Sequence, residues 1–362
     1  MRKIKIISLL LIINILLSGC ITITNKDLKD IGGFFRSSDL GETWQRKNIL
    51  YTLGNEVATF NRSNINKIIF DYNDQGALYL ASNNDGILYS YNYGNGWFNS
   101  LYGKGNVNDL VIDPYNKCIV YAALHNIIYK TNDCSRSWEA IYFETGENQF
   151  ITSLNINYNN SNIIYAGTSN GSLLKSFNAG DSWKVIKRFD DSLKKILIQN
   201  ISNKDIIYVA TQTKGIYKSF NNDQEWINLM DLVVEMVEVD GEELSQFSKI
   251  KDSNILLDLE LDKSIEDGLI YANKIGIFRL LDGVKWVQLK LLTAPSKEKI
   301  HEVMVNNNNG AEIIYLTSEA LYYSTDNGLN WQVKPLPSSQ RAGDLKFSPD
   351  GKYLYLGVYK IK

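Results

Sequence analysis

The chain has 362 residues, of which 44% are hydrophobic and 22% are charged, as is typical of a folded globular protein. Its formal net charge is −2, so nothing in the composition points to a polyanionic partner, and nucleic-acid binding is not expected. The 22 tyrosines and 7 tryptophans favour strands, whereas the asparagines and 25 glycines favour turns. A β-rich chain of this length provides one large domain or two small ones.

Residues 1–19 have the pattern of a secretory signal peptide. Three of the first five residues are basic, an apolar run follows over 6–17, and small residues precede Cys20. The ending Leu17-Ser18-Gly19-Cys20 resembles the bacterial lipobox, which implies cleavage before Cys20 and diacylation of its sulfur. The alternatives are a plain signal peptide or an N-terminal membrane helix, for which the apolar run is short.

Residues 20–31 are expected to form a lipidated tether. Residues 21–31 reach about 35 Å at most when fully extended. We therefore expect an extracytoplasmic protein held close to a bacterial membrane, on the cell surface or the periplasmic face.

The seven tryptophans each end a related segment, whose full form is Ser/Thr-x-Asp-x-Gly-x-x-Trp. Residues 37–44 and 324–331 match it completely, and the others match in part. The predicted motif residues are Asp39, Gly41 and Trp44; Asn92, Gly94 and Trp97; Asp133 and Trp138; Asn178, Gly180 and Trp183; Asn221 and Trp226; Trp286; and Asp326, Gly328 and Trp331.

The spacing has a local chemical reason. Asp or Asn accepts backbone N–H bonds inside a tight turn, and Gly tolerates a positive φ. The Trp then enters the next strand and packs its ring between sheets, which buries about 150–250 Å². We interpret the acidic residues of the motif as turn-stabilising and not as catalytic or metal-binding.

A second repeat precedes each motif and is centred on tyrosine. Its seven copies are residues 78–80, 120–122, 164–166, 207–209, 270–272, 314–316 and 354–356. With one strand before the Tyr run and one after it, each unit has four short strands, which is the blade of a β-propeller. Trp44 has no Tyr run before it and Tyr355 no Trp after it, so residues 343–359 are expected to complete a blade with residues 32–49.

The repeats predict an all-β fold for residues 32–362: a seven-bladed propeller of four-stranded antiparallel blades, closed by strands from both ends of the chain. An acidic insertion at residues 231–251 interrupts the repeat between blades 5 and 6, and residues 50–63 form a shorter excursion. Val237-Glu238-Val239 resembles half of a protruding hairpin. The insertion either decorates a binding face or is a solvated loop.

Two cysteines lie beyond Cys20, in the predicted propeller. Cys118 starts the second strand of blade 3, and Cys134 lies in the motif turn of the same blade. A disulfide is permitted outside the cytoplasm, and the pair is either bonded or two semi-buried thiols.

The Trp-ended motif resembles the Asp-box, or BNR repeat, and the resemblance covers residues 32–359. Sialidases share it but need an arginine triad, and the Arg-Ile-Pro motif that supplies their first arginine is absent. Arg36, Arg136 and Arg279 lie in or beside the motifs instead of at the central funnel. Xyloglucanase-type hydrolases place catalytic Asp residues between two propellers. This chain has room for one, with Asp258 and Glu260 as a candidate carboxylate pair.

The photosystem II assembly and stability factors are similar in size and plan, and sortilin-type ectodomains share the repeat. The resemblance implies a monomeric scaffold that binds a protein or peptide at the membrane surface, with no catalytic residue, metal or cofactor. The alternative is a carbohydrate-active propeller, either a glycoside hydrolase or a lectin. The scaffold hypothesis predicts a funnel without paired, perturbed carboxylates, and hydrolysis predicts two carboxylates about 5–10 Å apart in an aromatic groove. His125 and His301 fall in different blades, so no histidine-based metal cluster is expected.

Overall fold

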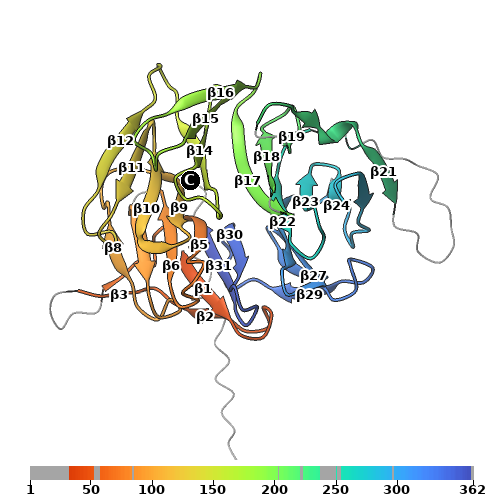
Figure 1. Ribbon diagram of the computed structural model, residues 1–362. Helices are drawn as coiled ribbons and strands as arrows, with labels where there is room; N and C mark the ends of the chain where they lie inside the picture. Colours follow the sequence, from red (N-terminus) through yellow and green to blue (C-terminus); the bar gives the residue numbers. More distant parts are fainter. Residues whose placement is uncertain are drawn as a thin grey trace, which may run out of the picture.

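The computed structural model describes residues 32–52, 58–83, 85–202, 204–220, 223–236, 250, 254–295 and 297–359, with the backbone alone for 233–236. These residues form seven blades around a central channel (Figure 1). The signal peptide, Cys20, Asn221 and the hairpin expected at 237–239 lie outside the described residues. In the described part of the chain, no helix is long and apolar enough to cross a membrane.

Each blade has four antiparallel strands, ordered from the channel outward. From blade 1 to blade 7, the inner strands are β30 (Arg341–Phe347), β5 (Ile65–Phe70), β9 (Val107–Asp113), β13 (Ile151–Ile156), β17 (Leu193–Ile201), β22 (Asp258–Asp262) and β26 (Ile300–Asn306). The second strands are β31 (Leu354–Tyr359), β6 (Leu78–Ser82), β10 (Asn116–Leu124), β14 (Ile164–Thr168), β18 (Lys204–Thr211), β23 (Gly268–Asn273) and β27 (Asn309–Thr317).

The two outer positions complete the blades in the same order. The third strands are β1 (Gly33–Ser37), β7 (Ile87–Ser90), β11 (Ile127–Thr131), β15 (Ser172–Ser176), β19 (Ile216–Ser219), β24 (Gly276–Leu281) and β28 (Ala320–Ser324). The fourth strands are β2 (Gln45–Arg46), β8 (Phe98–Ser100), β12 (Glu139–Phe143), β16 (Lys184–Arg188), β20 (Ile227–Asn228), β25 (Lys285–Gln288) and β29 (Gln332–Pro335).

The ring closes in blade 1, where strands from both ends of the chain pair. β1 pairs with β31 in register from Gly33 opposite Val358 to Ser37 opposite Leu354. Figure 1 shows these strands side by side, the first in red and the last in blue. The predicted fold class is therefore confirmed: seven four-stranded antiparallel blades with non-covalent closure.

The middle strands are apolar on both faces because each blade is packed between two others. Every residue of β6 and of β14 is buried, so these strands have no alternating polar face. The Tyr of each predicted repeat lies here, and Tyr79, Tyr165 and Tyr355 are each at most 2% exposed. Seven clusters of buried side chains result.

Two of the seven tryptophans are fully buried, and both are covered by the irregular excursions. The ring of Trp97 meets Phe60 at a centroid distance of 5.7 Å, and its Nε1 donates to Lys47 O at 2.7 Å. Trp286 Nε1 donates to Leu229 O at 2.8 Å, in the short 3-10 helix η1 (Leu229–Asp231). The other five indole rings are half-buried.

The excursions also add strands that the sequence did not indicate. Residues 49–59 contain a small ribbon, β3 (Ile49–Leu50) with β4 (Ala58–Thr59). Part of the acidic insertion, β21 (Val233–Met236), pairs in parallel with β25 and gives blade 6 a fifth strand. The described parts of both excursions, β3 with β4 and β21, are therefore folded strands.

Candidate binding site at the channel mouth

The predicted motif residues form turns between the third and fourth strands, which we call box turns. In the first, Ser37 Oγ accepts from Gly41 N at 2.8 Å, and Asp39 Oδ1 accepts from Thr43 N at 2.8 Å. The equivalent pairs of bonds recur in the box turns at residues 90–96, 131–137, 176–182 and 324–330. Gly41, Gly94, Gly180 and Gly328 have positive φ values of 91°, 77°, 94° and 83°.

The acidic groups of these turns are occupied by local hydrogen bonds. Bonds from the Thr43 side chain and backbone lower the pKa of Asp39 to about 2, and bonds from Ser137 do the same for Asp133. A carboxylate held in this way is a poor proton donor or acceptor at neutral pH. Among the described residues, no cluster of three His, Cys, Asp or Glu side chains has the geometry to hold a metal ion.

The two irregular boxes depart from this pattern. In blade 5, Asp223 takes the glycine position with a φ of 68°, although Trp226 Nε1 still donates to Asp223 O at 3.1 Å, as in the regular boxes that end in Trp97 and Trp183. In blade 6, Asp282 and Gly283 supply the left-handed residues with φ values of 50° and 65°, and Trp286 is wholly buried.

The structure joins Cys118 and Cys134 in a disulfide, and Cys134 N also donates to Cys118 O at 3.1 Å.

The box turns also connect neighbouring blades, through a contact that sequence reasoning missed. Tyr121 Oη and Lys130 Nζ both donate to Ala179 O at 3.0 Å, in the box turn of the next blade. Lys175 Nζ lies 2.5 Å from Asp223 Oδ2, which Tyr165 Oη also contacts. The signal was present in the sequence, because a basic residue directly precedes the first Ser or Thr of several boxes.

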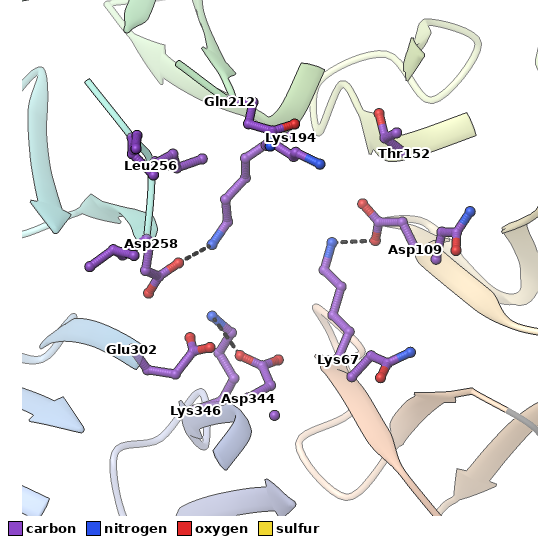
Figure 2. A pocket seen from close by; sticks show the side chains of 16 residues that line it. Lys67, Asp109, Thr152, Lys194, Gln212, Leu256, Asp258, Glu302, Asp344 and Lys346 are labelled. Carbon is purple, nitrogen blue, oxygen red and sulfur yellow. Dashed lines mark hydrogen bonds and ion pairs between the residues drawn. The ribbon is translucent and has the colours of Figure 1, made fainter. Parts of the chain in front are cut away.

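The cavity that we regard as the candidate site lies at one end of the central channel and has a volume of about 320 Å³. It opens where the inner strands begin, so strand starts from all seven blades surround it (Figure 2). Its lining is Asn66, Lys67, Asn108, Asp109, Thr152, Lys194, Lys195, Gln212, Ile255, Leu256, Leu257, Asp258, Glu302, Gly343, Asp344 and Lys346.

One position of the inner strand recurs around this cavity, which six of its seven residues line, and we call it the ring position. Strand pairing places it opposite equivalent residues of the second strands, and in six blades a register shift precedes it. From blade 1 to blade 7 its residues are Asp344, Lys67, Asp109, Ser153, Lys195, Asp258 and Glu302. The residue type changes from blade to blade, so no sequence repeat marked this ring.

Ion pairs join ring residues of neighbouring blades and also involve Glu260 and Lys346 further along the inner strands. Lys67 Nζ pairs with Asp109, and Lys195 Nζ lies 3.0 Å from Asp258 Oδ1 and 2.8 Å from Glu260 Oε1. Lys346 also pairs with Glu260. Although burial opposes its ionisation, the two ammonium groups hold the pKa of Glu260 at about 2. Asp258 and Glu260, the carboxylates noted in the sequence, therefore share Lys195.

Three ring carboxylates also fasten adjacent blades. Asp109 Oδ2 accepts from Leu154 N at 2.9 Å, Asp258 Oδ2 from Val303 N at 3.0 Å, and Asp344 Oδ2 from Ile68 N at 2.7 Å. Each bond runs from the inner strand of the next blade in the ring. These carboxylates are at most 7% exposed, so they are structural acceptors at the edge of the cavity.

Glu302 differs from the other ring carboxylates. Burial, together with the charges of Asp258 and Asp344, raises its pKa well above the usual range. Burial also raises the pKa of Asp344, against the effect of Lys346. The channel thus holds neighbouring carboxyl groups with raised pKa values. The scaffold hypothesis predicted a funnel without paired, perturbed carboxylates, and that prediction is wrong.

The lining of the cavity limits its chemistry. Lysine, amide and hydroxyl donors stand beside carboxylate acceptors, so the cavity offers hydrogen bonds and charges of both signs. None of the described residues that line it is aromatic. The described lining therefore does not provide the aromatic groove predicted for a sugar-cleaving site. Arg36, as expected, lies away from the channel, where it donates to Tyr93 O at 2.9 Å in an outer box turn.

The fold and its cavity define a seven-bladed β-propeller with a polar channel mouth. No model of a known protein family matches the chain, and no curated protein matches it in sequence. Solved structures of similar fold include YCF48 bound to D1 peptide, at 13% identity over 83% of this chain and 93% of that one, with a TM-score of 0.57. YCF48 from Cyanidioschyzon merolae is 12% identical over 82% and 96%, with a TM-score of 0.58.

The GH74 xyloglucanase from Xanthomonas campestris is also similar, at 11% identity and a TM-score of 0.60. The match covers 82% of this chain but only 51% of the xyloglucanase, so this chain spans about half of that enzyme. At such identities the likeness shows the fold alone.

Proposed function

We propose that this protein is a non-catalytic lipoprotein, anchored through Cys20 outside the cytoplasm, that binds a protein or peptide at the channel mouth. The observation that carries the proposal is the lining of the cavity, which presents donors and acceptors of both signs and lacks aromatic side chains among its described residues. A polypeptide offers the same mixture of groups, whereas sugar rings are bound by stacking on aromatic faces. The fold likeness to YCF48 bound to D1 peptide supports a peptide ligand.

The ring carboxylates support a binding role further. Asp109, Asp258 and Asp344 hold backbone N–H groups of the next blade, so a reaction that changed their protonation would loosen the ring. They are suited to shape a rigid mouth. The box motifs, which we assign to the Asp-box family of turns, set the blades around it.

Cross-linking in the native cells, followed by mass spectrometry, tests this function. Lys194 lines the cavity with an exposed side chain, and Lys184 is an exposed lysine on the outermost strand β16. We expect Lys194→Glu to abolish cross-linking to a specific protein and the matched Lys184→Glu variant to preserve it. Equal capture by both variants would place the binding surface elsewhere.

A glycoside hydrolase remains the second candidate, because Glu302 has the raised pKa of a general acid and stands beside Asp258. Polysaccharide hydrolysis by the soluble domain, residues 21–362, is the direct assay. Activity lost in Glu302→Gln, while the variant still unfolds cooperatively from a native-like state, would establish this function. We expect no hydrolysis by either protein.

A further inference from the structure

The point at which the tether joins the propeller is fixed by a buried asparagine. Asn48 is 3% exposed, and its Oδ1 accepts from Phe34 N at 2.7 Å. Its Nδ2 donates to Gly32 O at 3.3 Å and to Asn61 Oδ1 at 2.9 Å. Gly32, the first described residue, is therefore held at a defined place.

That place is on the same face as the channel mouth. Gly33 pairs with Val358, which pairs in turn with Ala342 on the inner strand. The next two residues of that strand, Gly343 and Asp344, line the cavity. The first described residues, Gly32 and Gly33, and the cavity thus lie at the same end of blade 1.

The length of the tether favours one orientation at the membrane. The blades are about 20 Å tall, since an inner strand such as β9 has 7 residues that rise about 3.3 Å each. A relaxed chain of the length of residues 21–31 spans roughly 20 Å. To turn the opposite face toward the membrane, the tether would have to run the full height of a blade first.

We infer that the channel mouth faces the membrane that anchors the chain, and that its occupant is an extracytoplasmic segment of a protein embedded in that membrane. The inference rests on the proposed anchor, and the orientation would hold for any anchor in residues 1–20. A polypeptide fits the mouth better than a lipid phosphate, because a phosphate would meet Asp109, Asp258 and Asp344 beside the lysines.

Two exposed tyrosines at opposite ends of β9 provide a matched test. Tyr102, 70% exposed, lies in the loop before β9, and Tyr115, 67% exposed, lies in the loop after it. Replacing each in turn with the photoreactive residue p-benzoylphenylalanine, in the full-length lipoprotein in its own cells, reports what each face touches. We expect the Tyr102 probe to cross-link to an integral membrane protein and that product to be lost when the probe is at Tyr115.

The pattern of products decides the outcome. Cross-links to a membrane protein from Tyr115 alone, or equally from both sites, would overturn the orientation. Cross-links from Tyr102 to lipid alone would overturn the polypeptide occupant. Membrane fractionation of the wild-type chain and of Cys20→Ala tests the anchor separately from the orientation. If the wild-type chain is not in the membrane fraction, the proposed anchor fails, whatever the orientation.

Discussion

The box turns and the ring position are two sevenfold features of the same propeller that differ in what they repeat. In the box turns the residue types recur, and five turns form the same pair of bonds around Asp or Asn. At the ring position the place recurs, but its residues include acids, lysines and one serine. A repeated residue indicates a demand of the fold. Where a position recurs but its residues differ, those residues can be adapted to a ligand while the blade architecture is kept.

The largest expected effect comes from Trp97, which ends a box and is fully buried. Trp97→Ala should lower the free energy of unfolding by about 3–5 kcal/mol, since it removes a ring packed against Phe34 and Phe60. Trp183→Ala is the matched change at a half-buried ring and should cost clearly less. Denaturant unfolding of residues 21–362 measures both, and equal losses would contradict the sealing role of the excursion.

The link between box turns and neighbouring blades should come next. Lys175→Met leaves the buried carboxylate of Asp223 unpaired, and we expect a loss of about 3 kcal/mol in the free energy of unfolding. Lys117 pairs with Asp74 at 2.7 Å where both side chains are over a third exposed, so Lys117→Met should cost at most about 1 kcal/mol. Similar losses for both variants would show that the Lys175 contact is not a buried latch.

Two substitutions at the ring position sharpen the comparison directly. Asp344→Ala strips the buried Ile68 N–H of its acceptor and should cost about 1–3 kcal/mol. Ser153 is 2% exposed and its Oγ has no partner in the described residues, so Ser153→Ala should be neutral within about 0.5 kcal/mol. Asp344→Asn keeps an oxygen acceptor and should recover much of the loss. A costly Ser153→Ala would show that the ring position has one uniform structural role.

The last expected effect is a dependence of stability on pH. Because the folded-state pKa of Glu302 is raised, the protonated group is favoured in the fold, and its contribution is greatest below the unfolded pKa near 4.5. That contribution is lost as the pH rises toward the folded-state pKa. The stability of Glu302→Gln relative to wild type should therefore increase from pH 4 to pH 8. Denaturant titrations at several pH values would show a flat difference if Glu302 ionised normally.

The architecture was predictable because it depends on residues that the fold repeats. Trp44 without a preceding Tyr run, and Tyr355 without a following Trp, predicted the shared blade that β1 and β31 form. The ring position was not predictable, since Lys67, Ser153 and Glu302 have nothing in common except their register after a bulge. The covering of Trp286 by η1 was also hidden, because that contact depends on how an insertion folds back.

The pairing of β1 with β31 has a consequence for biogenesis. The partners of Gly33 to Ser37 are residues 354–358, which lie more than 300 residues later in the chain. The circle therefore cannot close until residues 354–358 have emerged from the ribosome, and contacts of such long sequence separation form slowly. A chain truncated before β30 would keep an unpaired edge on β1, a surface at which quality-control proteases and aggregation act. Synthesis of β31 thus becomes the checkpoint for a sealed ring.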